Sequence, residues 1–202
     1  MVYRVNEIVA TVQGEGCNTG IPMVLVRLQG CDCRCAFCDT PHAMDPEGGR
    51  EMTAEDIVEE VTRYQGPEWV LLTGGEPTMQ DLGPLCQALC TAGYQIALET
   101  NGARTISYRE FDWICVSPKS PRIHADAAMY ADELKFIVRT SEDINRVETF
   151  LAEHQQYRLS GYTTICLQPE SRDPEATRLC YEACIANGWR LSTQVHKFIE
   201  VR

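Results

Sequence analysis

Met-Val-Leu-Val-Arg-Leu-Gln-Gly-Cys-Asp-Cys-Arg-Cys-Ala-Phe-Cys-Asp-Thr is the sequence of residues 23–40, and it carries the strongest structural signal in this chain of 202 residues. Residues 23–28 form an apolar run that is typical of a buried strand. Cys31, Cys35 and Cys38 follow in a C-x3-C-x2-C spacing. We therefore expect a loop with three thiols at the carboxyl end of a strand, where parallel α/β folds bind their ligands.

Three thiols on one short loop indicate an iron–sulfur cluster. A cubane cluster normally takes four thiolate ligands, one for each iron. Three ligands leave one iron open to a small molecule, which a pure electron carrier would not need. The spacing therefore predicts a reactive [4Fe-4S] site held by Cys31, Cys35 and Cys38.

Two other uses of these cysteines fit less well. A zinc site favours pairs of ligands at matched spacing, and the sequence offers no second C-x2-C pair. Disulfides need an oxidising compartment, and residues 1–7 have neither the apolar core nor the cleavage site of a secretory signal. We therefore expect a cytoplasmic protein with reduced cysteines.

Size and charge narrow the class of protein. The length fits one domain, residues 1–202. No apolar run reaches the roughly 18 residues that a membrane span needs. The net charge of −11, without a cluster of Lys and Arg, argues against direct binding of nucleic acid. An acidic protein with a few well-placed cations suits a small substrate.

Eleven cysteines exceed what one cluster needs. Because free cysteine packs as a small apolar residue, we expect those on predicted helices and strands to lie in the core. These are Cys86, Cys90, Cys115, Cys166, Cys180 and Cys184. A second cluster is the alternative, although their spacings match no ferredoxin pattern. Cys33 is not required by the cluster spacing, and Cys17 has no evident role.

Strands and helices alternate along the chain, which predicts an α/β fold with a parallel sheet. The predicted strands are 23–28, 68–73, 94–99, 113–117, 134–139, 163–167 and 189–193, the first of them being 23–28. The predicted helices are 53–65, 81–92, 141–153 and 173–187, and the regions 103–112 and 118–132 show little helical period. A complete eight-unit barrel usually needs about 250 residues, so we expect an abbreviated, open, partial (β/α) barrel.

Polar turns follow four of the predicted strands. They are Thr73-Gly74-Gly75-Glu76-Pro77, Glu99-Thr100-Asn101-Gly102, Ser117-Pro118-Lys119 and Gln168-Pro169-Glu170-Ser171. Each alone could be an ordinary turn. Together they predict a ring of ligand contacts at the carboxyl ends of the strands.

Three further features suggest what the site binds. Glu15, in the loop Gln13-Gly14-Glu15-Gly16, can accept hydrogen bonds from a guanine-like edge. Arg27 interrupts an apolar strand. It could point outward from a half-exposed face, but in a buried parallel strand it requires an anion, for which a carboxylate is the natural partner. Asp39-Thr40 could hold Mg²⁺ or simply cap a turn.

These motifs resemble the 7-carboxy-7-deazaguanine synthase family of the radical S-adenosylmethionine superfamily. The cysteine loop and the Gly-Gly-Glu turn resemble the superfamily, whereas the Gln-Gly-Glu-Gly loop, Arg27 and Cys38-Asp39-Thr40 resemble the family. The residues 194–198, Gln-Val-His-Lys-Phe, extend the match to nearly the whole chain.

The resemblance implies a radical SAM fold and a carbon–nitrogen lyase of queuosine biosynthesis. The cluster-bound S-adenosylmethionine would yield a deoxyadenosyl radical that takes hydrogen from C6 of 6-carboxytetrahydropterin. Ring contraction and loss of ammonia would then give 7-carboxy-7-deazaguanine, with Mg²⁺ assisting. The resemblance also implies a homodimer and an electron donor such as flavodoxin or ferredoxin.

The resemblance assigns roles to individual positions. It assigns Thr40 to the binding of Mg²⁺. It assigns to substrate binding the residues Val12, Gln13, Gly14, Glu15, Arg27, Thr73, His196 and Arg202, the last through its terminal carboxylate. It assigns a larger set to the binding of S-adenosylmethionine: Gly75, Glu76, Glu99, Asn101, Ser117, Pro118, Lys119, Gln168, Pro169, Glu170 and Ser171.

Two positions depart from the family pattern, and two other functions share parts of it. Cys33 adds a thiol between the first two ligands, and Arg202 adds a positive side chain at the terminal contact. A glycyl-radical activating enzyme would share the cysteine loop but would not need Arg27. A non-catalytic cluster carrier would need a fourth cysteine ligand.

Overall fold

The structure is a computed structural model, and it describes residues 1–106, 111–154 and 163–200. Its strands are β1 (Val2–Val12), β2 (Pro22–Leu28), β3 (Arg50–Thr53), β4 (Trp69–Gly74), β5 (Gln95–Thr100), β6 (Trp113–Val116), β7 (Glu133–Val138), β8 (Thr164–Pro169) and β9 (Arg190–Leu191). Its α-helices are α1 (Ala54–Thr62), α2 (Gly83–Thr91), α3 (Ala125–Tyr130), α4 (Ser141–Glu153), α5 (Pro174–Asn187) and α6 (His196–Ile199). Two short 3-10 helices, η1 (Pro41–Ala43) and η2 (Pro77–Met79), lie in the loops after β2 and β4.

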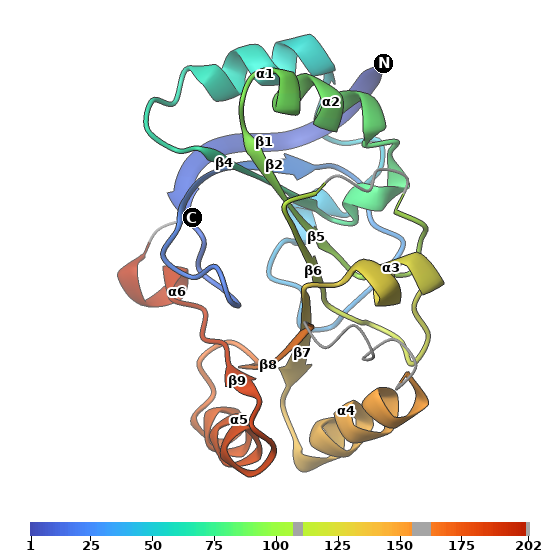
Figure 1. The fold of residues 1–202 in the computed structure, drawn as a ribbon, viewed down its shortest axis with the longest axis vertical. Helices are drawn as coiled ribbons and strands as arrows, with labels where there is room; N and C mark the ends of the chain where they lie inside the picture. Colours follow the sequence, from blue (N-terminus) through green and yellow to red (C-terminus); the bar gives the residue numbers. More distant parts are fainter. Residues whose placement is uncertain (107–110, 155–162, 201–202) are drawn as a thin grey trace.

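One curved sheet contains the nine strands, in the order β3-β1-β2-β4-β5-β6-β7-β8-β9. All neighbours from β2 to β9 are parallel, whereas β1 is antiparallel to both β2 and β3. The edge strands β3 and β9 do not pair, so the barrel stays open. Helices α1 to α5 cover the outer side of the curve, and α6 lies at the opening (Figure 1). The predicted open, partial barrel is confirmed.

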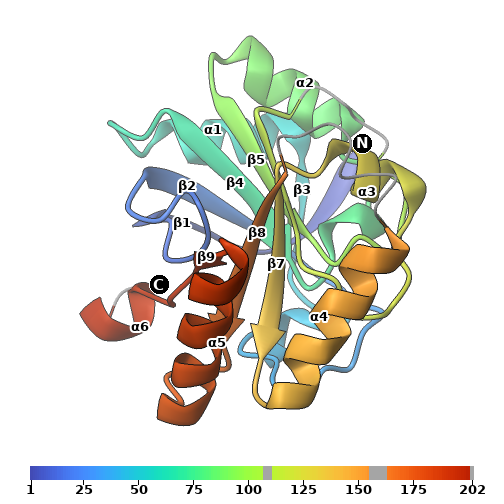
Figure 2. The same cartoon turned by 60° about the horizontal axis from the view of Figure 1, so that its bottom comes forward.

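Most of the apolar core lies between the sheet and the covering helices. Leu28, Leu72 and Leu98 of the strands are fully buried there with Ile57 of α1 and Leu85 of α2. Toward the β9 end of the sheet, on the same outer side, α4 and α5 pack side by side over β7 and β8 (Figure 2). This packing fixes the strands whose carboxyl ends form the site.

The inner face of the sheet changes from apolar to polar along the strands. Met23, Leu25, Leu71 and Ala97 form a small apolar cluster at the amino ends. Since every second side chain of a strand points to the same face, the next inward position on β2 is Arg27. In the parallel register Arg27 lies beside Thr73. The apolar cluster therefore closes one end of the barrel and leaves the carboxyl end polar.

Local capping signals located helices well. Thr53 and Asp56 form the expected capping box of α1, and Asp173 caps α5 with Pro174 in its first turn. Gly188 ends α5 in the left-handed region, with φ of 68°. Each of these signals lies within a few residues of the helix end that it sets.

One prediction about the elements was wrong, and two short elements were missed. The first strand is β1, not residues 23–28; a register shift between Val5 and Glu7 interrupts the alternation that would have revealed it. The four-residue β3 was also missed, because its short run has only Met52 buried. Residues 118–132 contain α3, which is only six residues long, capped by His124, and too short to show a helical period.

The predicted core cysteines are buried with one exception. Cys90 is exposed on α2, whereas Cys86, four residues earlier, is fully buried. The two residues share a helix, but the packing of α2 against the sheet covers only the position of Cys86. None of the helices in the described part of the chain has the length and apolar character that crossing a membrane requires.

Candidate active site

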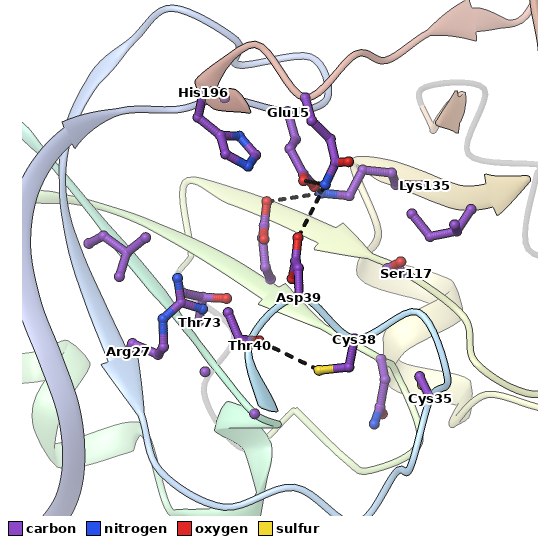
Figure 3. A pocket seen from close by; sticks show the side chains of 18 of the residues that line it. Glu15, Arg27, Cys35, Cys38, Asp39, Thr40, Thr73, Ser117, Lys135 and His196 are labelled. Atoms are coloured by element: carbon purple, nitrogen blue, oxygen red, sulfur yellow. Dashed lines mark hydrogen bonds and ion pairs between the residues drawn. The ribbon is translucent and has the colours of Figure 1, made fainter. Parts of the chain in front are cut away.

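A cavity of about 730 Å³ opens at the carboxyl ends of the parallel strands. It is lined by nearly all of the predicted site residues that the structure describes (Figure 3). These are Val12, Gln13, Gly14, Glu15, Arg27, Cys31, Cys35, Cys38, Thr40, Thr73, Gly75, Glu76, Glu99, Asn101, Ser117, Lys119, Gln168, Pro169, Glu170, Ser171 and His196. The fold thus brings turns from strands far apart in the sequence to one hollow.

The cysteine loop is anchored at its base. Gln29 is 3% exposed, and its side-chain amide donates to the carbonyls of His42, at 3.0 Å, and Asp45, at 2.7 Å. The backbone N–H of Gly30 donates to the Ala43 carbonyl at 2.8 Å. These bonds close the loop between β2 and η1, so the thiols lie at the cavity wall.

The donor set of the loop suits an iron–sulfur cluster. All eleven cysteines are free, and Cys31, Cys35 and Cys38 line the cavity half-buried. Burial raises the pKa of Cys31. The sulfur of Cys33 lies within 4.8 Å of the sulfur of Cys31. It accepts a hydrogen bond from Asn101 Nδ2 at 3.3 Å. Three thiols from one loop meet the ligand requirement of a cluster with one open iron.

The Gly-Gly-Glu turn is bonded directly to the cysteine loop. Glu76 N–H donates to the Gly30 carbonyl at 2.8 Å. A side chain at Gly75 would collide with the backbone carbonyls of Gly30 and Ala43. Glycine is therefore required at position 75 because the two backbones pass so closely.

Glu76 is 1% exposed and is satisfied by the protein itself. One carboxylate oxygen accepts from the hydroxyls of Thr78 and Thr100, each at 2.6 Å, and the other from the Asn101 N–H at 2.7 Å. These bonds tie the end of β4 to the end of β5. Glu76 borders the cavity, but its carboxylate holds the neighbouring turns in place.

Arg27 has a carboxylate partner within the protein, Glu7 of β1, which the sequence did not predict. Arg27 Nε lies 2.8 Å from Glu7 Oε1, and the two side chains are 15% and 20% exposed. Both line the cavity, with Thr73 beside Arg27 (Figure 3). The pair places a guanidinium at the cavity wall, where its Nε donates to Glu7.

A buried lysine organises the opposite wall. Lys135 of β7 is 3% exposed, and its ammonium lies 2.6 Å from Glu15 Oε2 and 3.1 Å from Glu99 Oε1. Gln194 Nε2 also donates to Glu15 Oε1 at 2.7 Å, and Gln13 Nε2 to Glu99 Oε1 at 3.1 Å. The predicted acceptors Glu15 and Glu99 therefore belong to one network.

The network fixes the charges of its members. Burial alone would raise the pKa of Glu15, but the charge and hydrogen bond of Lys135 lower it to about 2. Burial alone would lower the pKa of Lys135, but the acidic groups around it, including Cys115, Glu15 and Glu99, raise it well above its usual value. Glu15 is therefore an ionised acceptor at neutral pH.

The rim of the cavity adds Asp39, Thr40 and His196. Asp39 Oδ2 lies 3.2 Å from Lys197 Nζ and 3.3 Å from Gln194 Nε2. Thr40 Oγ1 lies 3.8 Å from Cys38 Sγ. A side chain at Gly14 would collide with the His196 ring, so the bare backbone there lets α6 close on the loop.

Two predicted residues are not placed in the cavity. Pro118 is half-buried but does not line it, and Arg202 lies outside the described residues. Glu7, Gln194 and Lys135 were not singled out from their chemistry, although all three line the cavity. Lys135 had the same signal as Arg27, a charge inside the apolar strand Glu-Leu-Lys-Phe-Ile-Val.

Comparison with known proteins gives consistent matches. The family model of the radical SAM superfamily matches residues 25–178. The 7-carboxy-7-deazaguanine synthase of Escherichia coli strain K12 is 35% identical in an alignment that covers 100% of both chains. The enzyme of the same name from Bacteroides thetaiotaomicron is 37% identical, again over 100% of both chains.

A solved structure matches the fold as well. The crystal structure of QueE from Escherichia coli superimposes with a TM-score of 0.87 at 34% sequence identity. The match covers 97% of this chain and 95% of that one. Sequence and fold thus point to the same group of proteins.

Proposed function

This chain belongs to the 7-carboxy-7-deazaguanine synthase family of the radical SAM superfamily, and from that membership we propose that it converts 6-carboxytetrahydropterin to 7-carboxy-7-deazaguanine with loss of ammonia. The observation that carries the proposal is the composition of one cavity. It combines a three-cysteine loop, a cation that can meet a carboxylate and an ionised acceptor that can meet a pterin edge. A carboxylated pterin needs the cation and the acceptor, and the radical chemistry needs the cysteine loop.

Cys31, Cys35 and Cys38 would hold the cluster. When bound, the cluster and S-adenosylmethionine supply the radical that starts the reaction. The chain contributes the wall that keeps these groups together, because the Gly-Gly-Glu turn is bonded to the base of the cysteine loop. The turns with Asn101, Ser117 and Lys119 would hold S-adenosylmethionine.

Other cavity residues complete that proposed site. Glu76 takes part through the turns that it braces, since both of its carboxylate oxygens already accept hydrogen bonds. Glu99 would contact S-adenosylmethionine from the cavity wall, where its Oε1 accepts from Gln13 and Lys135. The turn Gln168-Pro169-Glu170-Ser171 closes the cavity at the end of β8. Pro118 would act only by shaping the turn that carries Ser117 and Lys119.

Glu15 would select the pterin ring. The ring presents a ring N–H beside an exocyclic amine, which are two donors, and an ionised carboxylate has two acceptor oxygens with about four lone-pair positions. Lys135 and Gln194 use one position on each oxygen. The remaining positions suit the ring, and Gln13 lies alongside with its amide.

Arg27 would bind the substrate carboxylate. Its guanidinium offers five N–H donors in a planar fork, and Glu7 takes the Nε donor. Thr73 lies beside it in the sheet register. Val12, Gly14 and His196 would complete the substrate wall.

Thr40 would contribute to a Mg²⁺ site. A hydroxyl suits this hard cation, which usually keeps several waters and only a few protein ligands. Asp39 is paired with Lys197, so the Thr40 hydroxyl is the more available of the two as a ligand for the cation. The other ligands would come from the substrate and water.

The proposal also includes the partners that the family resemblance implies. An electron donor of the flavodoxin or ferredoxin class would reach the cysteine loop from its exposed side, where Phe37 is 41% exposed. A homodimer and a single domain for residues 1–202 belong to the same proposal, the latter supported by one sheet that spans the described residues.

An anaerobic turnover assay tests the function. The protein is reconstituted with iron and sulfide and supplied with reductant, Mg²⁺, S-adenosylmethionine and 6-carboxytetrahydropterin. We expect 7-carboxy-7-deazaguanine by mass spectrometry, formed only with S-adenosylmethionine. Cleavage of S-adenosylmethionine without that product would reject the substrate and favour a partner protein as the target.

A further inference from the structure

A second group of potential metal ligands lies outside the active-site cavity. Cys17 follows the loop that carries Glu15, Glu133 begins β7, and Cys166 lies in β8. One ligand atom from each of the three residues lies within 4.8 Å of the others. None of the three lines the cavity described above, and the proposed reaction does not use them.

The spacing of the sulfurs suits a tetrahedral metal site. Cys17 Sγ and Cys166 Sγ are 3.7 Å apart. Two thiolates bound tetrahedrally to Zn²⁺ at about 2.3 Å lie about 3.8 Å from each other. The two side chains therefore already stand at the separation that one zinc ion requires.

One oxygen of the Glu133 carboxylate has no partner among the described residues. Glu133 is 1% exposed, and its Oε2 accepts the Cys17 N–H at 2.9 Å. Its Oε1 is buried and has no hydrogen bond within the described part of the chain. Lys135, two residues along the same strand, bonds to Glu15 and Glu99 instead. A buried carboxylate oxygen without a partner is costly, and a bound cation would satisfy it.

We propose that Cys17, Glu133 and Cys166 bind one Zn²⁺ ion, with water as the fourth ligand. Zinc prefers this mixture of thiolate and carboxylate donors in tetrahedral geometry. Binding would release the two thiol protons, so the net charge of the site stays at one negative. The ion would join the loop after β1 to β7 and β8.

The loop itself has the shape that such a link requires. Gly16 is in the left-handed region, with φ of 66°, and a side chain there would collide with the Glu133 carboxylate. The Gly16 N–H also donates to Ser192 Oγ at 2.8 Å. The loop therefore lies directly on Glu133, and a metal there would hold Glu15 in place as a structural ion.

Metal analysis of the cluster-loaded protein tests the site. The holoenzyme is exposed anaerobically to Zn²⁺ alone, passed over a desalting column and analysed for zinc and iron. We expect one zinc per chain beyond the irons. X-ray absorption at the zinc edge should show two sulfur ligands at about 2.3 Å and oxygen ligands at about 2.0–2.2 Å.

Variants locate the ion. Cys17→Ser and Cys166→Ala should lose the zinc while keeping the iron, and Glu133→Gln should weaken zinc retention. Cys180→Ala, a matched change at a buried cysteine of α5, should keep both metals. If Cys166→Ala fails to fold, the ligand set of the unaltered protein decides.

Three outcomes would overturn the proposal. The unaltered holoenzyme could retain no zinc, as expected if a buried water serves Glu133. The zinc could survive in the Cys17→Ser variant, or its spectrum could show only sulfur ligands. Mass spectrometry could instead find a Cys17–Cys166 disulfide in the anaerobically prepared protein.

Discussion

The cysteine loop and the buried lysine network border the same cavity, but they are built in different ways. The loop draws its three proposed ligands from eight consecutive residues, Cys31 to Cys38. The network joins Lys135 to Glu15 across 120 residues and to Glu99 across 36 residues. The loop cysteines are half-buried, whereas Lys135 is 3% exposed.

This difference separates chemistry from stability. A thiol at the cavity wall can be replaced without disturbing the core around it. A buried cation that neutralises two carboxylates cannot, because its loss leaves both charges uncompensated in a medium of low polarity. Substitutions of Cys31, Cys35 or Cys38 should therefore abolish activity alone, and those in the network should also destabilise the fold.

The largest expected effect is on activity, in Cys35→Ser. We expect loss of bound iron and of turnover to background, because a hydroxyl is a poor ligand for iron in a cluster. The free energy of unfolding of the metal-free protein should change by less than about 0.5 kcal/mol. Iron analysis, the turnover assay and denaturant unfolding check the three parts.

Two other cysteine substitutions serve as controls for Cys35→Ser. Cys90→Ser, at the exposed cysteine of α2, should leave iron content and turnover unchanged. Cys33→Ser should keep its iron, since the spacing does not require that thiol. Retention of iron and activity by Cys35→Ser would contradict the assignment, and loss of iron from Cys33→Ser would make Cys33 a ligand.

Lys135→Met should produce the largest loss of stability. Breaking a buried ion pair by removing one partner typically costs about 3–5 kcal/mol. The control is Arg63→Met, whose ion pair with Glu59 has both side chains more than half exposed, at 68% and 70%, and should therefore cost far less. Equal losses in the two variants, measured by denaturant unfolding, would reject the distinction between the two regions.

Acid should weaken the network next. The carboxyl pKa of Glu15 is 4.5 in the unfolded reference and about 2 in the folded protein. Because the folded pKa lies below the unfolded pKa, the ionised Glu15 carboxylate stabilises the fold at pH values above 4.5. This contribution disappears as the pH falls from 4.5 toward 2. At about 1.4 kcal/mol per pKa unit the contribution is about 3 kcal/mol.

Comparison with Glu15→Gln measures that contribution. The unaltered protein should exceed the variant in unfolding free energy at neutral pH, and the excess should shrink at about pH 3, within this window. An excess that does not change with pH would show that Glu15 does not titrate in the network.

Arg27→Ala should have the smallest of these effects. Losing a charge-assisted hydrogen bond to the substrate carboxylate costs about 1.5–3 kcal/mol, or roughly a 10- to 150-fold rise in KM. Iron content should not change, because Arg27 does not contact the cysteine loop in any described bond. The control is Arg4→Ala. Arg4 lies on β1, as Glu7 does, and its ion pair is with Glu51 of β3, so its loss should leave KM unchanged. Unchanged turnover of Arg27→Ala would reject the carboxylate site.

Much of the fold followed from short sequence signals. Thr53 with Asp56 and Asp173 with Pro174 located α1 and α5 because capping bonds connect residues within one turn. The strand β1 was not predicted, because the register shift between Val5 and Glu7 interrupts its alternation of apolar and polar residues. The cysteine loop and the Gly-Gly-Glu turn predicted the superfamily, which the comparisons confirm.

The sequence by itself therefore determined the chemistry that fits in a short window: the three-cysteine spacing, the turns at the strand ends and the family to which they belong. Only the tertiary structure decided that Arg27 pairs with Glu7, that Lys135 neutralises Glu15 and Glu99, and that Cys17 meets Cys166. The reason is that Coulomb and coordination energies depend on separations of a few ångströms between side chains. Those separations are set by strand register and helix packing, which join residues that are far apart in the chain.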